Sequence, residues 1–222
     1  MRTIKIYALL LVCTVFLAQT SFAQKNSKES INGEGSTVKQ ELNIDRFHTI
    51  GLGVPAKVYV SKGAQKVTIE AQRNIIDNIE TDVKDGSWSI EFDKRVRKHA
   101  EITIYITMPT VEGLAIGGSG EIIGKDNFNG LSNLNISIGG SGEIEFAGSA
   151  NTVEISIAGS GTVKTGDLKS KNCTVNIAGS GEAYVEASED LDVSIAGSGD
   201  VRYKGSPKVS KSIAGSGSVR SM

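Results

Sequence analysis

The stretch SIAGSGDVRY (residues 194–203) is one of six near-copies in a chain of 222 residues. Each copy reads Ile, then Gly or Ala, then Gly-Ser-Gly. The copies begin at Ile116, Ile138, Ile157, Ile177, Ile195 and Ile213, at spacings of 22, 19, 20, 18 and 18 residues. A period of about 20 residues is typical of a solenoid, and it is too short for a propeller blade, which needs about 40.

Each copy also contains two segments in which apolar and polar residues alternate. VEISI (153–157) comes before one Gly-Ser-Gly, and TVKT (162–165) follows it. Such alternation indicates a strand with one buried face. Alignment of the copies gives columns of like residues, which indicate coils stacked in register. The sequence therefore predicts an all-β protein whose C-terminal half is a parallel β-solenoid (β-helix) of about six coils. One column reads Leu134, Val153, Cys173, Leu191 and Val209; the next reads Leu114, Ile136, Ile155, Val175, Val193 and Lys211; the column after the corner reads Ile122, Ile144, Val163, Ala183, Val201 and Val219.

The Gly-Ser-Gly triplet is interpreted as a structural corner of each coil. Glycine adopts positive φ without strain, and it leaves room for the coils above and below. The serine hydroxyls of successive corners are expected to form a ladder of hydrogen bonds to backbone or to each other. The predicted corner residues are Gly118, Ser119, Gly120, Gly140, Ser141, Gly142, Gly159, Ser160, Gly161, Gly179, Ser180, Gly181, Gly197, Ser198, Gly199, Gly215, Ser216 and Gly217.

The composition changes near Pro109, because 20 of the 26 glycines lie at or after Gly113. We therefore divide the chain into a β-rich N-terminal half (36–112) and the repeat solenoid (113–222). The N-terminal half is either a sandwich-like lead domain or a set of irregular opening coils of the same solenoid. Within it, KDGSW (84–88) predicts a hairpin turn and RNIIDN (73–78) a short helical turn.

The N-terminal segment (1–23) has two basic residues, a short apolar run and small residues before Ala23, as a secretory signal peptide does. Residues 24–35 are expected to form a disordered linker. The exported chain would reach the periplasm, the cell surface or the medium. Without the signal peptide it has 22 basic and 25 acidic residues, a balance that does not favour nucleic acid or an anionic membrane as partner. Cys173 would be its one cysteine, in a core column, so no disulfide within the chain is expected.

Four patterns that could carry chemistry are interpreted as structural. GLGVPA (51–56) matches a dinucleotide-binding pattern, but a predicted strand follows it where that site needs a helix. Glu121, Glu143, Glu182 and Asp200 share a column that a cation could bridge, yet Thr162 interrupts it and solvated carboxylates are favoured. The two histidines, His48 and His99, lie outside the repeats, so the corner serines lack a base and no metal or cofactor is expected. The basic run KRVRKH (94–99) is assigned to a solvent loop, with contact to an anionic glycan left open.

The stretch YITMPTVEGLAIGGSGEI (105–122), followed by recurring Gly-Ser-Gly coils, resembles the putative auto-transporter adhesin, head GIN domain family of bacterial envelope proteins. The resemblance covers roughly residues 40–220. It implies a parallel β-solenoid body and a role in adhesion, and it supplies no catalytic residues. We therefore expect a non-enzymatic, exported envelope protein that acts as an adhesin or binding scaffold. The alternatives are a polysaccharide-active β-helix enzyme, which the short connections between coils disfavour, and a structural envelope protein without a ligand.

Two surfaces are predicted to meet partners. One outward polar position recurs beside each corner, and we predict that these positions form a face for envelope or host polysaccharide or protein. The second surface is the end of the stack, where Lys211 replaces an apolar residue and is expected to limit association of solenoid ends into homo-oligomers. The candidate binding face consists of Ser137, Ser156, Asn176, Ser194 and Ser212.

Overall fold

The computed structural model of the chain describes residues 30–222. Residues Ile31–Met222 form one compact unit. The predicted signal peptide and residues 24–29 of the predicted linker lie outside the described residues. Within the described part, no helix has the length and apolar character needed to cross a membrane.

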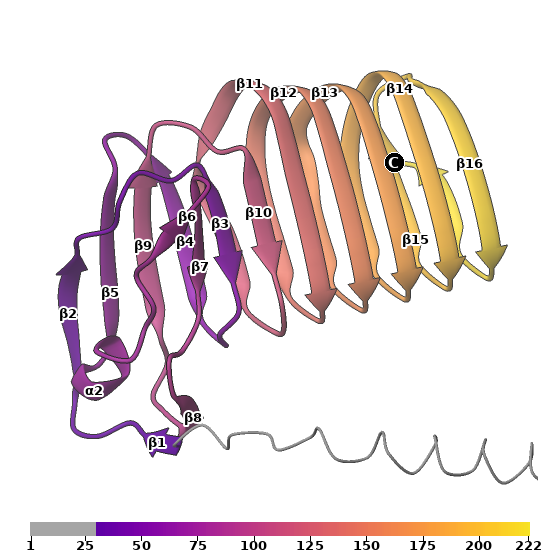
Figure 1. Cartoon of the computed structure of the whole chain (residues 1–222). Coiled ribbons are helices and arrows are strands. Elements are labelled where there is room, and N and C mark those ends of the chain that lie inside the picture. The colour runs from indigo at the N-terminus through magenta and orange to yellow at the C-terminus, as the bar shows by residue number, and fades with distance from the viewer. Residues whose placement is uncertain (1–29) are drawn as a thin grey trace, which may run out of the picture. The chain divides into compact units, whose positions relative to one another are not determined.

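Four long strands form the body of a parallel β-solenoid, as the repeat predicts (Figure 1). They are β11 (Glu121–Gly140), β12 (Glu143–Gly159), β13 (Thr162–Gly179) and β14 (Glu182–Gly197). The last coil consists of β15 (Asp200–Lys204), β16 (Lys208–Gly215) and β17 (Ser218–Ser221). Each long strand runs from one Gly-Ser-Gly to the next, so the variable stretches that the sequence suggested as connections are also strand.

The predicted columns match the observed register. Ile136 pairs with Ile155, which pairs with Val175, and the column continues through Val193 to Lys211. The unequal repeat lengths are absorbed by register shifts in the variable stretches, for example between Ile123 and Asn127. Beside one such shift the Phe128 and Phe146 rings stack with centroids 4.9 Å apart, and both rings are buried. Apolar side chains in the variable stretches therefore close the core where the repeat pattern is weakest.

The solenoid continues into the N-terminal half, which agrees with the second of the two alternatives for that half. β3 (Thr49–Leu52) pairs in parallel with β10 (Gly113–Ile116), and β4 (Lys57–Lys62) pairs in parallel with β11. β7 (Ser87–Ile90) and β9 (Thr103–Met108) add a further parallel layer on β3 and β4. One 15-stranded sheet system thus contains strands from both halves.

Antiparallel strands complete the N-terminal end. β5 (Lys66–Gln72) pairs with β9 on one side and with β2 (Thr37–Leu42) on the other. β6 (Val83–Lys84) forms the predicted hairpin with β7, and positive φ angles at Asp85 (49°) and Gly86 (71°) fit a tight turn. The predicted helical turn is α2 (Arg73–Ile76).

Two expectations for the N-terminal half need correction. The basic run at 94–99 contains a short strand, β8 (Arg95–Lys98), which pairs with β1 (Ser30–Asn32). Residues 30–35, which we expected to be disordered, contain β1 and two further anchors. The Gly33 amide donates to the Lys98 carbonyl (2.7 Å), and the Glu34 amide donates to Asn74 Oδ1 (3.0 Å). Hydrogen bonds to a neighbouring strand and helix therefore order a segment whose composition is that of a linker.

The corner follows the prediction for glycine but not for serine. The first glycine of the triplet has positive φ, 129° at Gly159 and 130° at Gly197. The third glycine has no such φ, but an added Cβ at Gly199 would lie 2.6 Å from Ile177 Cγ2 and 2.8 Å from the Gly181 oxygen. The ladder between corners consists of backbone bonds: the amide of each corner serine after the first donates to the first glycine of the preceding coil, at 2.8–2.9 Å. The serine side chains are exposed, so water can satisfy their hydroxyls, and they make no hydrogen bond within residues 30–222.

Candidate functional site

The predicted binding face lines a groove of about 610 Å³, which we call the small-residue groove. The polar positions of the face alternate along each strand with isoleucines, which are buried in all coils but the last, and a column of glycine and alanine lies beside them. The polar column consists of Ser137, Ser156, Asn176, Ser194 and Ser212, and the neighbouring column of Gly139, Ala158, Ala178, Ala196 and Ala214.

The parallel register places one polar side chain per coil at a constant spacing. Ser137 pairs with Ser156, which pairs with Asn176, and the column continues to Ser194 and Ser212. Adjacent strands in a sheet lie about 4.8 Å apart, so five coils present a line of donors and acceptors about 19 Å long. Each inner strand pairs on both sides, which fixes the backbone below the groove.

The chemistry of the small-residue groove is that of hydrogen bonding and contact. No side chain that lines it ionises, so the groove offers neither a general acid nor a general base. Hydroxyl and amide groups can donate and accept, and the alanine column leaves room for a ligand to approach the sheet closely. The arrangement supports binding of an extended molecule along the solenoid axis.

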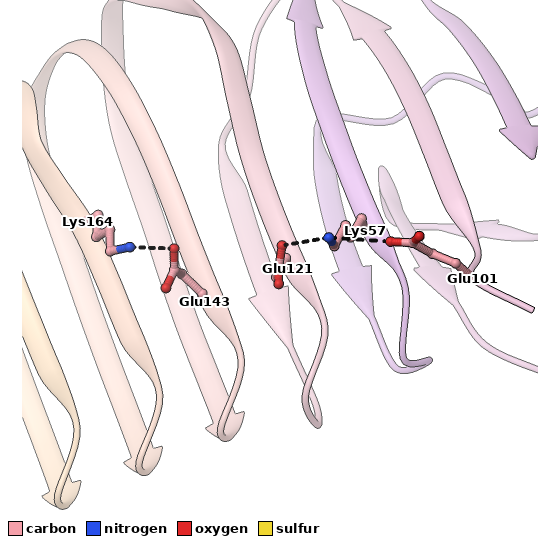
Figure 2. Close-up of polar contacts among 5 residues, drawn as sticks. All are labelled: Lys57, Glu101, Glu121, Glu143 and Lys164. Carbon is pink, nitrogen blue, oxygen red and sulfur yellow. Dashed lines mark hydrogen bonds and ion pairs between the residues drawn. The ribbon is translucent and has the colours of Figure 1, made fainter.

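The carboxylate column noted in the sequence lies on strands that follow the corner. Glu121 pairs in register with Glu143, and the column continues through Thr162 to Glu182 and Asp200. Protein donors neutralise it (Figure 2): Lys57 Nζ lies 3.9 Å from Glu121 and 3.3 Å from Glu101, and Lys164 Nζ lies 2.6 Å from Glu143.

The remaining acids of the column receive hydroxyl donors. Tyr184 Oη donates to Glu182 (2.8 Å), and Ser218 Oγ donates to Asp200. The hydrogen bond to Glu143 raises the pKa of Lys164, and that to Glu101, with attraction to Glu121, raises the pKa of Lys57. A bound cation is therefore not needed to offset repulsion in the column. Residues 30–222 contain no group of three or more His, Cys, Asp or Glu side chains placed to hold a metal ion.

A second groove, of about 310 Å³, lies on the strands after the corner, and we call it the charged groove. Sequence reasoning missed it, because its side chains come from the variable stretches of several coils and share no column motif. The one signal in the sequence was the pair of small residues Ala147 and Gly166, which stand between larger side chains of neighbouring coils. The groove is lined by Gly124, Glu145, Phe146, Ala147, Lys164, Gly166, Asp167, Tyr184, Lys204 and Met222.

The histidines and the cysteine are placed apart from both grooves. His48 Nδ1 lies 3.0 Å from Glu112 Oε2, and His99 Nδ1 lies 2.6 Å from the Ala100 oxygen. Cys173 is buried in its predicted core column, and burial raises the pKa of its thiol to about 12.

Comparison with known proteins identifies the family. The profile described as "Putative auto-transporter adhesin, head GIN domain" matches residues 46–207. The chain belongs to this family. No protein of curated function matched.

Solved structures share the fold of this adhesin-family chain. A putative adhesin from Bacteroides fragilis is 23% identical with a TM-score of 0.72, and the match covers 86% of this chain and 100% of that one. A putative lipid binding protein from Parabacteroides distasonis is 25% identical with a TM-score of 0.56, covering 87% and 100%. A putative adhesin from Parabacteroides merdae is 18% identical with a TM-score of 0.55, covering 87% and 99%. The family supports a binding or adhesin role, and the solved neighbours show the fold.

Proposed function

We propose that the protein is an exported adhesin that holds an extended polymer, such as an envelope or host polysaccharide, along the small-residue groove. The observation that carries this proposal is the column of hydroxyl and amide side chains, one per coil, in a groove of about 610 Å³ without ionisable groups. A repeating ligand can meet this column with one contact per coil.

The strength of such binding would come from repetition. A single hydrogen bond of this kind contributes about 0.5–1.5 kcal/mol net, so one coil alone would bind weakly. Five coils in register act together when the ligand spans them. The inner strands of the groove are fixed by pairing on both sides, so the protein loses little conformational entropy when the ligand binds.

The proposal is tested with two variants that carry the same change in charge. Ser156→Glu/Asn176→Glu places two carboxylates in the groove, and Thr152→Glu/Asn172→Glu places two on the same strands away from it. Binding to purified bacterial surface polysaccharide is measured by biolayer interferometry, and circular dichroism checks the fold. The groove variant is expected to bind at least about tenfold more weakly than the control. Equal binding by the two folded variants would place the partner surface elsewhere.

A further inference from the structure

The charged groove has an open apolar floor. Ala147 and Gly166 are the small residues of the floor, and the buried Phe146 ring lies beside them. Above Gly166 the nearest atoms to an added Cβ would be Lys204 Cε and Nζ and Met222 Cε, all at 3.8 Å. A methyl-sized group therefore fits over Gly166 in ordinary van der Waals contact, and the atoms around it are the flexible ends of two long side chains.

One wall of the charged groove is a tyrosine whose orientation is fixed. Tyr184 Oη donates to Glu182 (2.8 Å) and accepts from Arg202 Nη1 (2.7 Å). The Arg202 guanidinium also lies 5.3 Å from the centre of the Tyr184 ring. These contacts hold the ring in place before any ligand arrives, which lowers the entropic cost of binding.

The ionised groups of the charged groove balance one another. Lys204 Nζ lies 2.9 Å from Asp167, while Lys164 is paired with Glu143 and attracted by Glu145. An anionic ligand would compete with these carboxylates for the lysines, and a cationic ligand would compete with the lysines for the carboxylates. A neutral polyhydroxyl ligand can donate to the carboxylates and accept from the ammonium groups while both ion pairs remain.

We propose that the charged groove is a binding site for a neutral sugar ring. The apolar floor at Ala147 and Gly166 would receive the C–H face of the ring, and Glu145, Lys164, Asp167 and Lys204 would bind its hydroxyls. This site lies on different strand segments from the small-residue groove and does not depend on the function proposed for it.

Methionine methyl resonances provide a direct test. Met222 lines the charged groove, whereas Met108 is fully buried in the core and serves as an internal control. The protein with ¹³C-labelled methionine methyl groups is titrated separately with glucose, galactose and mannose. At least one hexose is expected to shift the Met222 signal in a saturable way and to leave the Met108 signal unmoved. Galacturonate, the charged counterpart of galactose, is expected to cause less shift than galactose at equal concentration.

A pair of glycine variants locates the site. Gly166→Leu fills the groove at a position without positive φ, where the atoms nearest to an added Cβ are the flexible ends of Lys204 and Met222, so the fold is expected to survive. Gly117→Leu makes the same change outside the charged groove, at a glycine with no atom within 4 Å of its added Cβ. Hexose binding is expected to weaken at least about tenfold in Gly166→Leu and to remain in Gly117→Leu and in Ser156→Glu/Asn176→Glu. The proposal is overturned if no hexose shifts Met222, if galacturonate acts like galactose, or if folded Gly166→Leu responds as the wild type does.

Discussion

At the corner of each coil, two glycines meet different constraints. Gly197 has a φ of 130°, which side chains of L-residues rarely adopt, whereas Gly199 faces Ile177 Cγ2 and the Gly181 oxygen of the coil before it. We predict that Gly199→Val lowers the free energy of unfolding by about 3 kcal/mol, because the added methyl groups overpack a site that already excludes a Cβ. Urea unfolding followed by circular dichroism measures the change.

Gly117→Ala is the matched control for that prediction. An added Cβ at Gly117 would meet no atom within 4 Å, and its φ is not in the left-handed region. Alanine there restricts the unfolded chain and should raise the free energy of unfolding by about 0.4–1 kcal/mol. If Gly199→Val lowers the free energy of unfolding by no more than the size of the change at Gly117→Ala, the coils are not packed as tightly as the corner geometry requires.

The buried thiol of Cys173 gives a second prediction at the residue scale. Its pKa of about 12 means that almost no thiolate forms at pH 8, and the side chain is only 2% exposed. Iodoacetamide should therefore leave Cys173 unmodified in the folded protein over hours and alkylate it promptly in 8 M urea, as mass spectrometry of the peptide that contains Cys173 would show. Rapid alkylation of the folded protein would mean that the coil opens around Cys173.

At the scale of single strands, the carboxylate column tests whether cations matter. Each acid of the column has a protein partner: Lys57 forms an ion pair with Glu121, and Lys164, Tyr184 and Ser218 donate hydrogen bonds to the others. We predict that 5 mM Ca²⁺ changes the Tm by less than about 2 °C, which corresponds to less than 1 kcal/mol for a chain of this size. Differential scanning fluorimetry with and without EDTA measures this, and a clear rise in Tm with Ca²⁺ would reveal a cation site that the donors do not satisfy.

β16, which pairs on one side only, with β14, tests the role of Lys211. Val209 and Ile213 of this strand are 36% and 37% exposed, and Lys211 stands between them over Val193 in the core column. A charge at an exposed sheet edge opposes edge-to-edge pairing. We predict that Lys211→Val forms concentration-dependent oligomers, whereas Ser210→Val, which adds the same side chain on the outward face, does not. Light scattering that gave the same mass for both variants would remove the protective role of the lysine.

At the scale of the whole molecule, sequence reasoning succeeded where like residues recur and failed where they do not. The column from Ile122 through Ile144 and Val163 could be read directly, because stacked coils repeat their core residues. The pairing of β3 with β10 could not, because that coil lacks Gly-Ser-Gly and the paired residues are 64 positions apart in the chain. The register of the N-terminal strands depends on long-range contacts that no local pattern encodes.

The candidate sites divide in the same way. The column of Ser156, Asn176 and Ser194 was predictable, since its members occupy one place in the repeat. The partners of the carboxylate column were not predictable. Lys57 comes from the N-terminal half, and Lys164 differs in type from its neighbours in its own column. Charged side chains reach across coils to partners that the fold, not the repeat, brings near.

The central claim, that a polymer lies along the small-residue groove, is tested most directly by cysteine footprinting. Ser156→Cys places one reactive thiol in the groove, Ser206→Cys places one in an exposed loop outside it, and Cys173 stays unreactive in both. Alkylation rates are compared with and without saturating surface polysaccharide. The account predicts at least about fivefold slower alkylation at Ser156→Cys and an unchanged rate at Ser206→Cys. Equal rates at Ser156→Cys in the presence of demonstrated polysaccharide binding would contradict it.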